Sequence, residues 1–162
     1  MQREVVEADV LCAGGGPAGL MAAIRASELG ARVVVAEKGN TLRSGAAATG
    51  VDHFNCYIPE IHGDLEPIVR ARMREEVSRS ADHIRIQFEK SYDIVKLWEN
   101  WGIPMKYKGR YEFAGHAYPG ASVPPISLKI HGENVKPILT REAQKRGVNI
   151  SNYSACRIMP IK

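Results

Sequence analysis

The stretch CAGGGPAGL, residues 12–20, constrains the fold of this chain more than any other feature of its sequence. Three consecutive glycines follow the apolar run DVLCA, residues 9–13, which has the length and composition of a buried strand. Apolar residues then recur at helical spacing over residues 17–29. The valine-rich segment 31–37 is typical of a second strand. These segments predict a βαβ unit at residues 8–37.

Gly14, Gly16 and Gly19 give the turn the pattern GxGxxG, in which each glycine has its own role when a dinucleotide binds. The first permits the tight turn, the second lets a pyrophosphate approach the backbone, and the third lets the helix pack on the strand. Pro17 and Ala18 would lie in the first helical turn beside the diphosphate. Unpaired N–H groups and the helix dipole favour negative charge there.

The surroundings of the turn strengthen a pattern that is weak alone, because glycine-rich turns are common. The second strand ends in Glu37, eighteen residues after Gly19, where a carboxylate accepts hydrogen bonds from a ribose. The alternatives are a turn that binds no ligand and a Glu37 that is only a surface charge. We interpret the turn as a phosphate site, because a strand, a helix and an acid all stand where a dinucleotide needs them.

The segment after the second strand, EKGNTLRSGAAATGVDHFN at residues 37–55, separates the two common dinucleotides. NAD and FAD both use the glycine turn, but NAD enzymes usually have no such second segment. Small residues would let the backbone reach an isoalloxazine ring, and a serine hydroxyl can contact a diphosphate. The segment therefore favours FAD.

Four places in the chain carry a resemblance to a known family. They are GGGPAG (14–19), RSGAAATG (43–50) with the later Asn55, LWENWGIP (97–104) and HGENVK (131–136). The chain resembles the flavoprotein subunit of the succinate dehydrogenase/fumarate reductase family, and the last two motifs favour its adenylylsulfate reductase alpha-subunit branch. The first motif is shared by many flavoproteins, whereas the second is much more specific.

The resemblance implies roles for individual residues. The three glycines of the turn would hold the diphosphate and Glu37 the adenosine ribose, with Lys38 beside it. Asn55 would approach the reactive edge of the flavin near N5, and Ala155 would offer its backbone to the adenine. The expected cofactor-binding residues of the loop are Arg43, Ser44, Gly45, Ala48, Thr49 and Gly50.

One departure from the family concerns the attachment of the flavin. Membrane-bound members carry a histidine after the serine, and this histidine binds FAD covalently. Gly45 stands at that place and has no side chain to attach, so the resemblance implies non-covalent FAD. His53 lies eight residues further on, and we expect a role in the loop for it rather than attachment.

The predicted fold class is α/β, a doubly wound FAD-binding (Rossmann-like) domain. Because the chain ends at RIMPIK, inside what looks like a strand, we expect only the N-terminal part of this domain, with inserted helices, and a remainder elsewhere. The helical segment should break near Ser80. The expected segments are the βαβ unit at 8–37, a flavin loop at 38–63, a helical segment at 64–102, a loop and strand region at 103–131, and a helix and strands at 132–162.

The expected function is that of an FAD-dependent oxidoreductase subunit of fumarate reductase or adenylylsulfate reductase type, passing electrons between a small anionic substrate and an iron–sulfur protein subunit. The alternatives are an electron-transfer flavoprotein subunit without its own substrate, or an NAD(P)-dependent oxidoreductase, for which a second GxGxxG is missing from these residues. The family's catalytic residues lie beyond this chain, so none is assigned. His116, in a glycine- and aromatic-rich loop, is the histidine that best suits a site.

Composition excludes several other classes. The net charge of +4 is diffuse and without a basic stripe, so we expect no nucleic acid. The three cysteines form no CxxC pair, and no metal site is predicted. No apolar run approaches the roughly 20 residues of a membrane span. The polar N-terminus does not resemble a signal peptide, so a cytoplasmic location is expected.

Overall fold

The structure, a computed structural model, describes residues 5–75, 80–114 and 124–155. The chain divides into two compact units. We call residues 1–50 with 133–162 the first unit and residues 51–132 the second unit, and describe each by itself.

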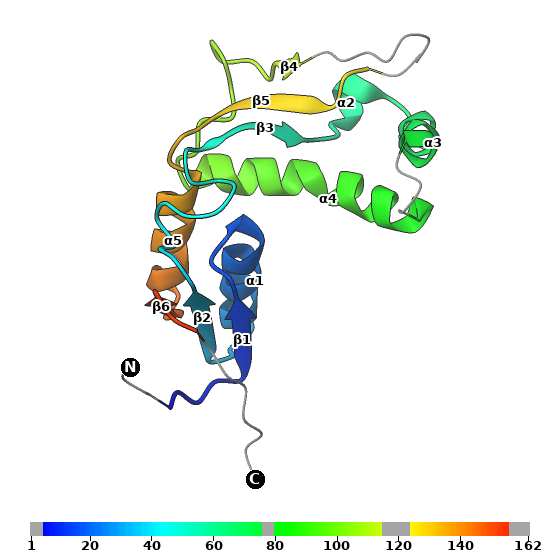
Figure 1. The fold of residues 1–162 in the computed structure, drawn as a ribbon. Coiled ribbons are helices and arrows are strands. Elements are labelled where there is room, and N and C mark those ends of the chain that lie inside the picture. The colour runs from blue at the N-terminus through cyan, green and yellow to red at the C-terminus, as the bar shows by residue number, and fades with distance from the viewer. Residues whose placement is uncertain (1–4, 76–79, 115–123, 156–162) are drawn as a thin grey trace. The chain divides into compact units, whose positions relative to one another are not determined.

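The first unit is built on a parallel three-stranded sheet in the order β1-β2-β6 (Figure 1). Val10 lies opposite Val33, and Val34 lies opposite Asn149. With the second strand at the centre, this is the order in which one half of a doubly wound sheet is built. The elements are β1 (Val10–Ala13), α1 (Pro17–Glu28), β2 (Val33–Glu37), α5 (Val135–Lys145) and β6 (Asn149–Asn152).

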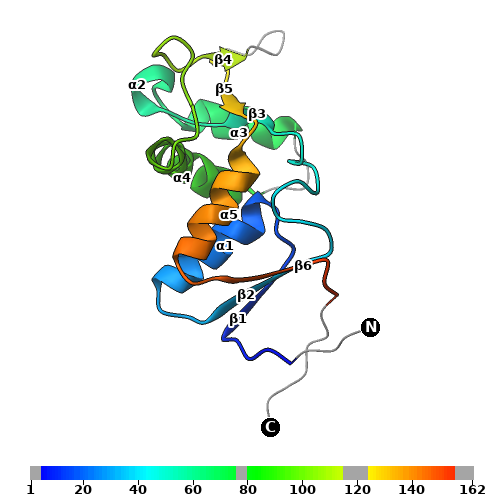
Figure 2. The same ribbon diagram turned by 90° about the vertical axis from the view of Figure 1, so that its left-hand side faces the viewer.

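Helices α1 and α5 lie side by side over one face of this sheet (Figure 2). Leu20, Ala23 and Ile24 of α1 are buried, as are Leu139 and Ala143 of α5. These residues recur every three or four positions, so each helix has one apolar stripe to bury. This packing fixes α1, and with it the turn that precedes it.

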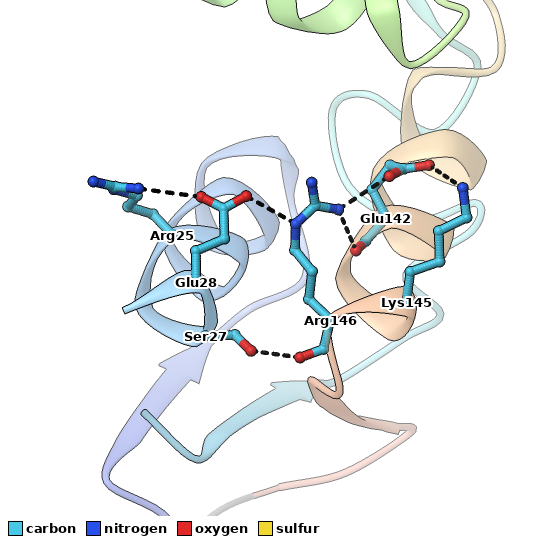
Figure 3. A network of polar contacts seen from close by, with 6 residues as sticks. All are labelled: Arg25, Ser27, Glu28, Glu142, Lys145 and Arg146. Atoms are coloured by element: carbon cyan, nitrogen blue, oxygen red, sulfur yellow. Dashed lines mark hydrogen bonds and ion pairs between the residues drawn. The ribbon is translucent and has the colours of Figure 1, made fainter. Parts of the chain in front are cut away.

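A polar network joins the C-terminal ends of the two helices (Figure 3). Arg146 donates from Nε to Glu28 of α1 over 2.8 Å, and from Nη1 to Oε2 of Glu142 over 3.0 Å. Burial alone would raise the pKa of the Glu142 carboxyl, but hydrogen bonds from Lys145 and Arg146 hold that pKa below its ordinary value. The ionised Glu142 therefore holds Arg146, which joins the end of α5 to the end of α1.

In its described residues, the second unit pairs an antiparallel sheet, in the order β3-β5-β4, with the helices α2, α3 and α4. Its strand register places Asn55 opposite Ser127, and Phe113 opposite Leu128. The elements are β3 (Val51–Asn55), α2 (Pro59–His62), α3 (Glu66–Glu75), α4 (Ala81–Asn100), β4 (Phe113–Ala114) and β5 (Ser127–Gly132).

The second unit contains an apolar cluster of buried residues. Ile68 and Val69 of α3 meet Ile84 and Phe88 of α4, and Ile126 joins them at the edge of β5. Ser80 begins α4, because its side chain accepts a hydrogen bond from the His83 N–H at 3.3 Å. The break that the sequence predicts near Ser80 therefore separates α3 from α4.

The predicted α/β fold is confirmed, but one segment differs from its prediction. Residues 38–63 were expected to be a flavin loop, and they contain strand β3 and helix α2. The polar side chains of Asp52, His53 and Asn55 give β3 no apolar run. The strand forms because it pairs with β5, which lies about seventy residues later in the chain. Among the described residues, no helix is both long and apolar enough to cross a membrane.

Candidate functional site

The glycine turn joins β1 to α1 in the geometry that its three glycines predict. Gly14 has a φ of +114°, a backbone conformation that favours glycine, and its N–H donates to the Ala36 carbonyl at 2.8 Å. A Cβ on Gly19 would overlap the Gly14 carbonyl oxygen, so only glycine allows α1 to approach the turn this closely. A Cβ on Gly16 would meet no atom within 4 Å. The space beside Gly16 is thus open for a ligand to approach the backbone.

No side chain accepts a hydrogen bond from the backbone N–H groups at the N-terminus of α1. Gly16 is the N-cap, Pro17 is the first helical residue with Ala18 next to it, and no side chain caps the helix. The first turn also contains no acidic residue. The exposed N–H groups and the positive end of the helix dipole are therefore available to an anion from outside the helix.

Glu37, the last residue of β2, is only 7% exposed and holds two parts of the site together. Its Oε2 accepts from the Gly15 N–H at 2.6 Å, and its Oε1 accepts from the Gly39 N–H at 2.8 Å. These backbone hydrogen bonds hold the pKa of the Glu37 carboxyl below its ordinary value. The carboxylate is ionised near neutral pH, and each oxygen keeps a lone pair that can accept from a hydroxyl.

Thr41 lies against the glycine turn with its side chain fully buried. A Cβ on Gly15 would overlap the Thr41 methyl group, which leaves no room there for another residue. The Thr41 N–H donates to Oδ1 of Asn152 at 2.9 Å, but its Oγ1 has no hydrogen-bond partner within the described ranges. A buried hydroxyl without a partner is unfavourable, so this atom marks an incomplete set of contacts beside the turn.

The loop between β2 and the second unit is tied to α5 at two points. Arg43 donates to the Glu133 carbonyl at 2.8 Å and to Oδ1 of Asn134 at 3.3 Å. Nζ of Lys136 donates to the Ser44 carbonyl at 2.8 Å and reaches the Ser44 Oγ at 3.4 Å. These contacts fix the first half of the loop.

The second half of the loop turns at residues with positive φ. Gly45 has a φ of +74° and Gly50 a φ of +121°. The Ala48 N–H donates to the Gly45 carbonyl at 3.1 Å, and Thr49 is exposed. Gly45 is exposed and presents only backbone, and its correspondence to the histidine that binds FAD covalently in other members stays a prediction.

The remaining predicted site residues divide between the two units. Ser154, which precedes the exposed Ala155, donates its N–H to the Glu37 carbonyl at 3.0 Å. Ala155, which comes after β6, therefore lies next to a residue that is hydrogen-bonded to the end of β2. Lys38 is exposed beside it. Asn55 belongs to the second unit, where it ends β3, and its predicted role stays a prediction. His116 lies outside the described residues.

Lys136 and Thr41 are the polar residues of this site that the sequence did not single out. Lys136 belongs to the motif HGENVK, but no role followed from that motif. It stands next to Val135 on the stripe of α5 that also carries Leu139, and this spacing could have indicated a buried lysine.

Comparisons with known proteins agree with this geometry. The family model described as FAD binding domain matches residues 9–124. The solved adenylylsulfate reductase from Archaeoglobus fulgidus is 30% identical with a TM-score of 0.68, over 91% of this chain and 24% of that chain. An adenosine-5-phosphosulfate reductase in complex with sulfite, as a covalent adduct, gives 30% identity, a TM-score of 0.69 and the same coverage.

A flavocytochrome c3 fumarate reductase shares the fold at 19% identity, with a TM-score of 0.70 over 90% of this chain and 26% of that chain. No match was found among curated protein sequences. The chain thus spans about a quarter of the length of the reductases it resembles.

The residues of the first unit fit FAD. The open space beside Gly16, the uncapped start of α1 and the ionised Glu37 offer, in turn, backbone access, N–H donors and an acceptor for ribose hydroxyls. The family match covers the βαβ unit that carries all three of these features. This chain belongs to the family whose model is described as FAD binding domain.

Proposed function

We propose that this chain is the FAD-binding part of an oxidoreductase subunit of adenylylsulfate reductase type. The observation that carries the proposal is the 30% identity to adenylylsulfate reductase over 91% of this chain. The fumarate reductase and other flavoproteins share the fold at 19% identity or less, which supports the fold alone.

The residues of the first unit would position the cofactor, and FAD would supply two-electron redox chemistry. The turn would bind the diphosphate through backbone N–H groups. Glu37 would accept hydrogen bonds from the adenosine ribose. Because an ionised carboxylate repels a phosphate, Glu37 also disfavours a dinucleotide with a 2′-phosphate on that ribose.

The cofactor would be held without a covalent bond. Gly45 has no side chain, and its φ of +74° disfavours any residue that could supply one. Lys38, Arg43, Ala48, Thr49 and Gly50 would complete the binding surface of the loop, with Ala155 at the adenine.

The partners follow from the same likeness. We propose a small anionic substrate, a sulfur oxyanion bound to a nucleotide, and an iron–sulfur protein subunit that exchanges electrons with the flavin. The anionic substrate agrees with the net charge of +4. The catalytic residues would lie in the part of such reductases that this chain does not span. A cytoplasmic location stays a prediction.

The first test is an absorbance spectrum of the intact protein before and after acid precipitation. Flavin bands that move to the supernatant are the expected result. Flavin that stays in the pellet would contradict non-covalent binding, and absence of flavin after incubation with FAD would contradict the cofactor.

The second test separates the substrate classes. In the presence of both sulfite and AMP, the intact protein should reduce ferricyanide, because joining sulfite to AMP releases two electrons. Each reagent alone is the control. Fumarate-dependent oxidation of a reduced viologen dye, without the sulfite activity, would replace the proposed substrate by a dicarboxylate. Bound flavin with neither activity would favour an electron-transfer subunit without its own substrate.

A further inference from the structure

Lys136 is buried in a place where a lysine is unfavourable for two reasons. Its side chain is 1% exposed, the largest of the fully buried side chains in the described part of the chain. Burying an ammonium group costs free energy unless hydrogen bonds and an opposite charge compensate. Lys136 is also the second residue of α5, where the positive end of the helix dipole repels a cation.

The first turn of α5 contains no acidic residue, so the compensation must come from elsewhere. The Lys136 ammonium reaches both the carbonyl and the hydroxyl of Ser44, 92 residues earlier in the chain. Ser44 and Glu37 both border Gly39, because a Cβ on Gly39 would lie 3.0 Å from the Ser44 Cβ and 3.5 Å from Oε1 of Glu37. The Glu37 charge also attracts Lys136. Lys136, Ser44 and Glu37 thus form a chain of neighbouring residues, in which Lys136 and Glu37 are buried and Ser44 is half-buried.

The Lys136–Ser44–Glu37 chain ends on the groups that would hold the cofactor. The same Glu37 carboxylate accepts from the N–H of Gly15 in the glycine turn and from the N–H of Gly39 at the start of the loop. Moving Ser44 or Glu37 would therefore shift the turn and the loop together. A lysine that only packed against its neighbours would not couple the glycine turn to the loop in this way.

We propose that Lys136 is a positioning residue for FAD. By holding Ser44 and Glu37 in place, Lys136 sets the affinity for the ADP half of the cofactor. The proposal rests on FAD binding by this chain and not on the substrate of the oxidoreductase. Affinity and backbone mobility are measured without turnover, so its failure is separate from failure of the proposed function.

The ionisation of the pair agrees with this role. Burial lowers the pKa of the Lys136 ammonium, while the nearby Glu37 charge raises it again. The Glu37 carboxyl has a lowered pKa, first because of its backbone hydrogen bonds and further because of Lys136. Each charge therefore stabilises the ionised form of the other.

The first test replaces the ammonium by an apolar group of similar length, Lys136→Met, in the intact protein. The control is Lys145→Met on the same helix, because Lys145 is exposed and forms its ion pair with Glu142. Three quantities are measured: the Kd for FAD from the quenching of its fluorescence, the Kd for ADP-ribose by competition, and hydrogen exchange of the apoprotein at residues 38–50.

Lys136→Met should weaken binding of both FAD and ADP-ribose by about 10- to 100-fold, because a charged hydrogen-bond donor is lost. Exchange should become faster at residues 38–50 while β1 and α1 keep their protection. Lys145→Met should change none of these quantities. Unchanged affinity and exchange in Lys136→Met would overturn the proposal. Faster exchange throughout the first unit would overturn it too, because Lys136 would then be a general structural residue.

The second test replaces Ser44, the partner of Lys136. Ser44 is half-buried, and its change to alanine removes only one hydroxyl group. Ser44→Ala should weaken FAD binding in the wild-type background. It should have less effect in the Lys136→Met background, because the contact between residues 136 and 44 is already lost there. An equal loss of FAD affinity in the two backgrounds would show that Ser44 and Lys136 act independently, and would overturn the proposal. If Lys136→Met does not fold, faster loop exchange in Ser44→Ala decides for the proposal and unchanged exchange decides against it.

Discussion

The two units of the chain differ in what they bury. The first unit buries Glu37, Lys136 and Glu142, together with the hydroxyls of Thr41 and Thr140. The second unit buries a cluster of isoleucine, valine and phenylalanine side chains, with His62 and Ser91 as its buried polar residues among those described. Burying a charge costs free energy of desolvation. The charged residues of the first unit therefore carry a cost that the apolar cluster of the second unit does not.

The buried polar groups of the two units are also satisfied in different ways. His62 accepts from the Ile58 N–H at Nδ1 over 2.9 Å and reaches the Pro125 carbonyl from Nε2 over 3.1 Å. Both ring nitrogens are then occupied by backbone. Thr41, by contrast, has a buried hydroxyl without a partner in the described part of the chain, and Glu37 can accept further donors. We infer that the second unit is organised by packing and the first by groups prepared for a ligand.

The largest effect should come from a substitution that closes the glycine turn. In Gly19→Val the new side chain would collide with the Gly14 carbonyl, so α1 could not dock and FAD binding should be lost. Loss of flavin from the purified protein and a lowered midpoint of thermal unfolding would check this.

Gly16→Ala is the matched variant. Gly16 has a φ of −72° and open space at its Cβ, so alanine fits the fold and occupies only the place of the diphosphate. We expect a folded protein with weaker FAD binding. If Gly16→Ala binds FAD normally, the diphosphate does not approach the turn at this residue.

The next effect concerns packing in the second unit. Phe88 is 2% exposed inside the apolar cluster, so Phe88→Ala should lower the free energy of unfolding by about 3–5 kcal/mol. Urea denaturation followed by tryptophan fluorescence measures this loss. Ile86→Ala on the same helix is the control, since Ile86 is 59% exposed and should change stability by less than about 0.5 kcal/mol. Similar losses in both variants would mean that this cluster is not the core of the unit.

The same contrast explains which elements the sequence could predict. Strand β1, helix α1 and strand β2 follow each other directly, and each carries its own apolar pattern and end signals, so residues 8–37 were predicted nearly in full. Strand β3 was missed because its stability comes from β5, far along the chain. The predicted break near Ser80 is confirmed, since Ser80 is the N-cap of α4.

The candidate site divides along the same line. The geometry of the glycine turn and the place of Glu37 at the end of β2 could be predicted, because they depend on a short segment with fixed spacing. The contact from Lys136 to Ser44 joins residues 92 positions apart, and no local pattern contains it. Thr41 was missed for a related reason, since its burial depends on packing against Gly15.

A smaller effect, with a pH dependence, should follow from Glu37→Gln. The lowered pKa of Glu37 means that its contribution to stability is complete above the unfolded value of about 4.3 and is lost as the pH falls through the folded value. The wild type should therefore lose stability below about pH 4.3, and Glu37→Gln should show a flatter profile there. Thermal unfolding between acidic and neutral pH measures both profiles.

Glu37→Gln should also weaken FAD binding by about 10-fold at neutral pH, because an amide accepts less strongly than a carboxylate and places a donor beside the turn. Glu133→Gln, at an exposed residue near the start of α5, is the control. Identical acid profiles in the wild type and Glu37→Gln would assign the acid sensitivity to other carboxylates.

The smallest effect is expected at an exposed charge of the first unit. It tests whether burial determines how much a charge in this unit contributes to the unfolding free energy. Arg25 contacts Glu28 at 3.3 Å across one helical turn, and its side chain is 69% exposed. Arg25→Ala should therefore cost only about 0.2–0.5 kcal/mol of unfolding free energy. Arg146 contacts the same Glu28 but is 25% exposed and also binds the buried Glu142, so Arg146→Ala should cost more. Equal costs in urea denaturation would show that the network in Figure 3 acts as one unit, in which an exposed ion pair matters as much as a buried one.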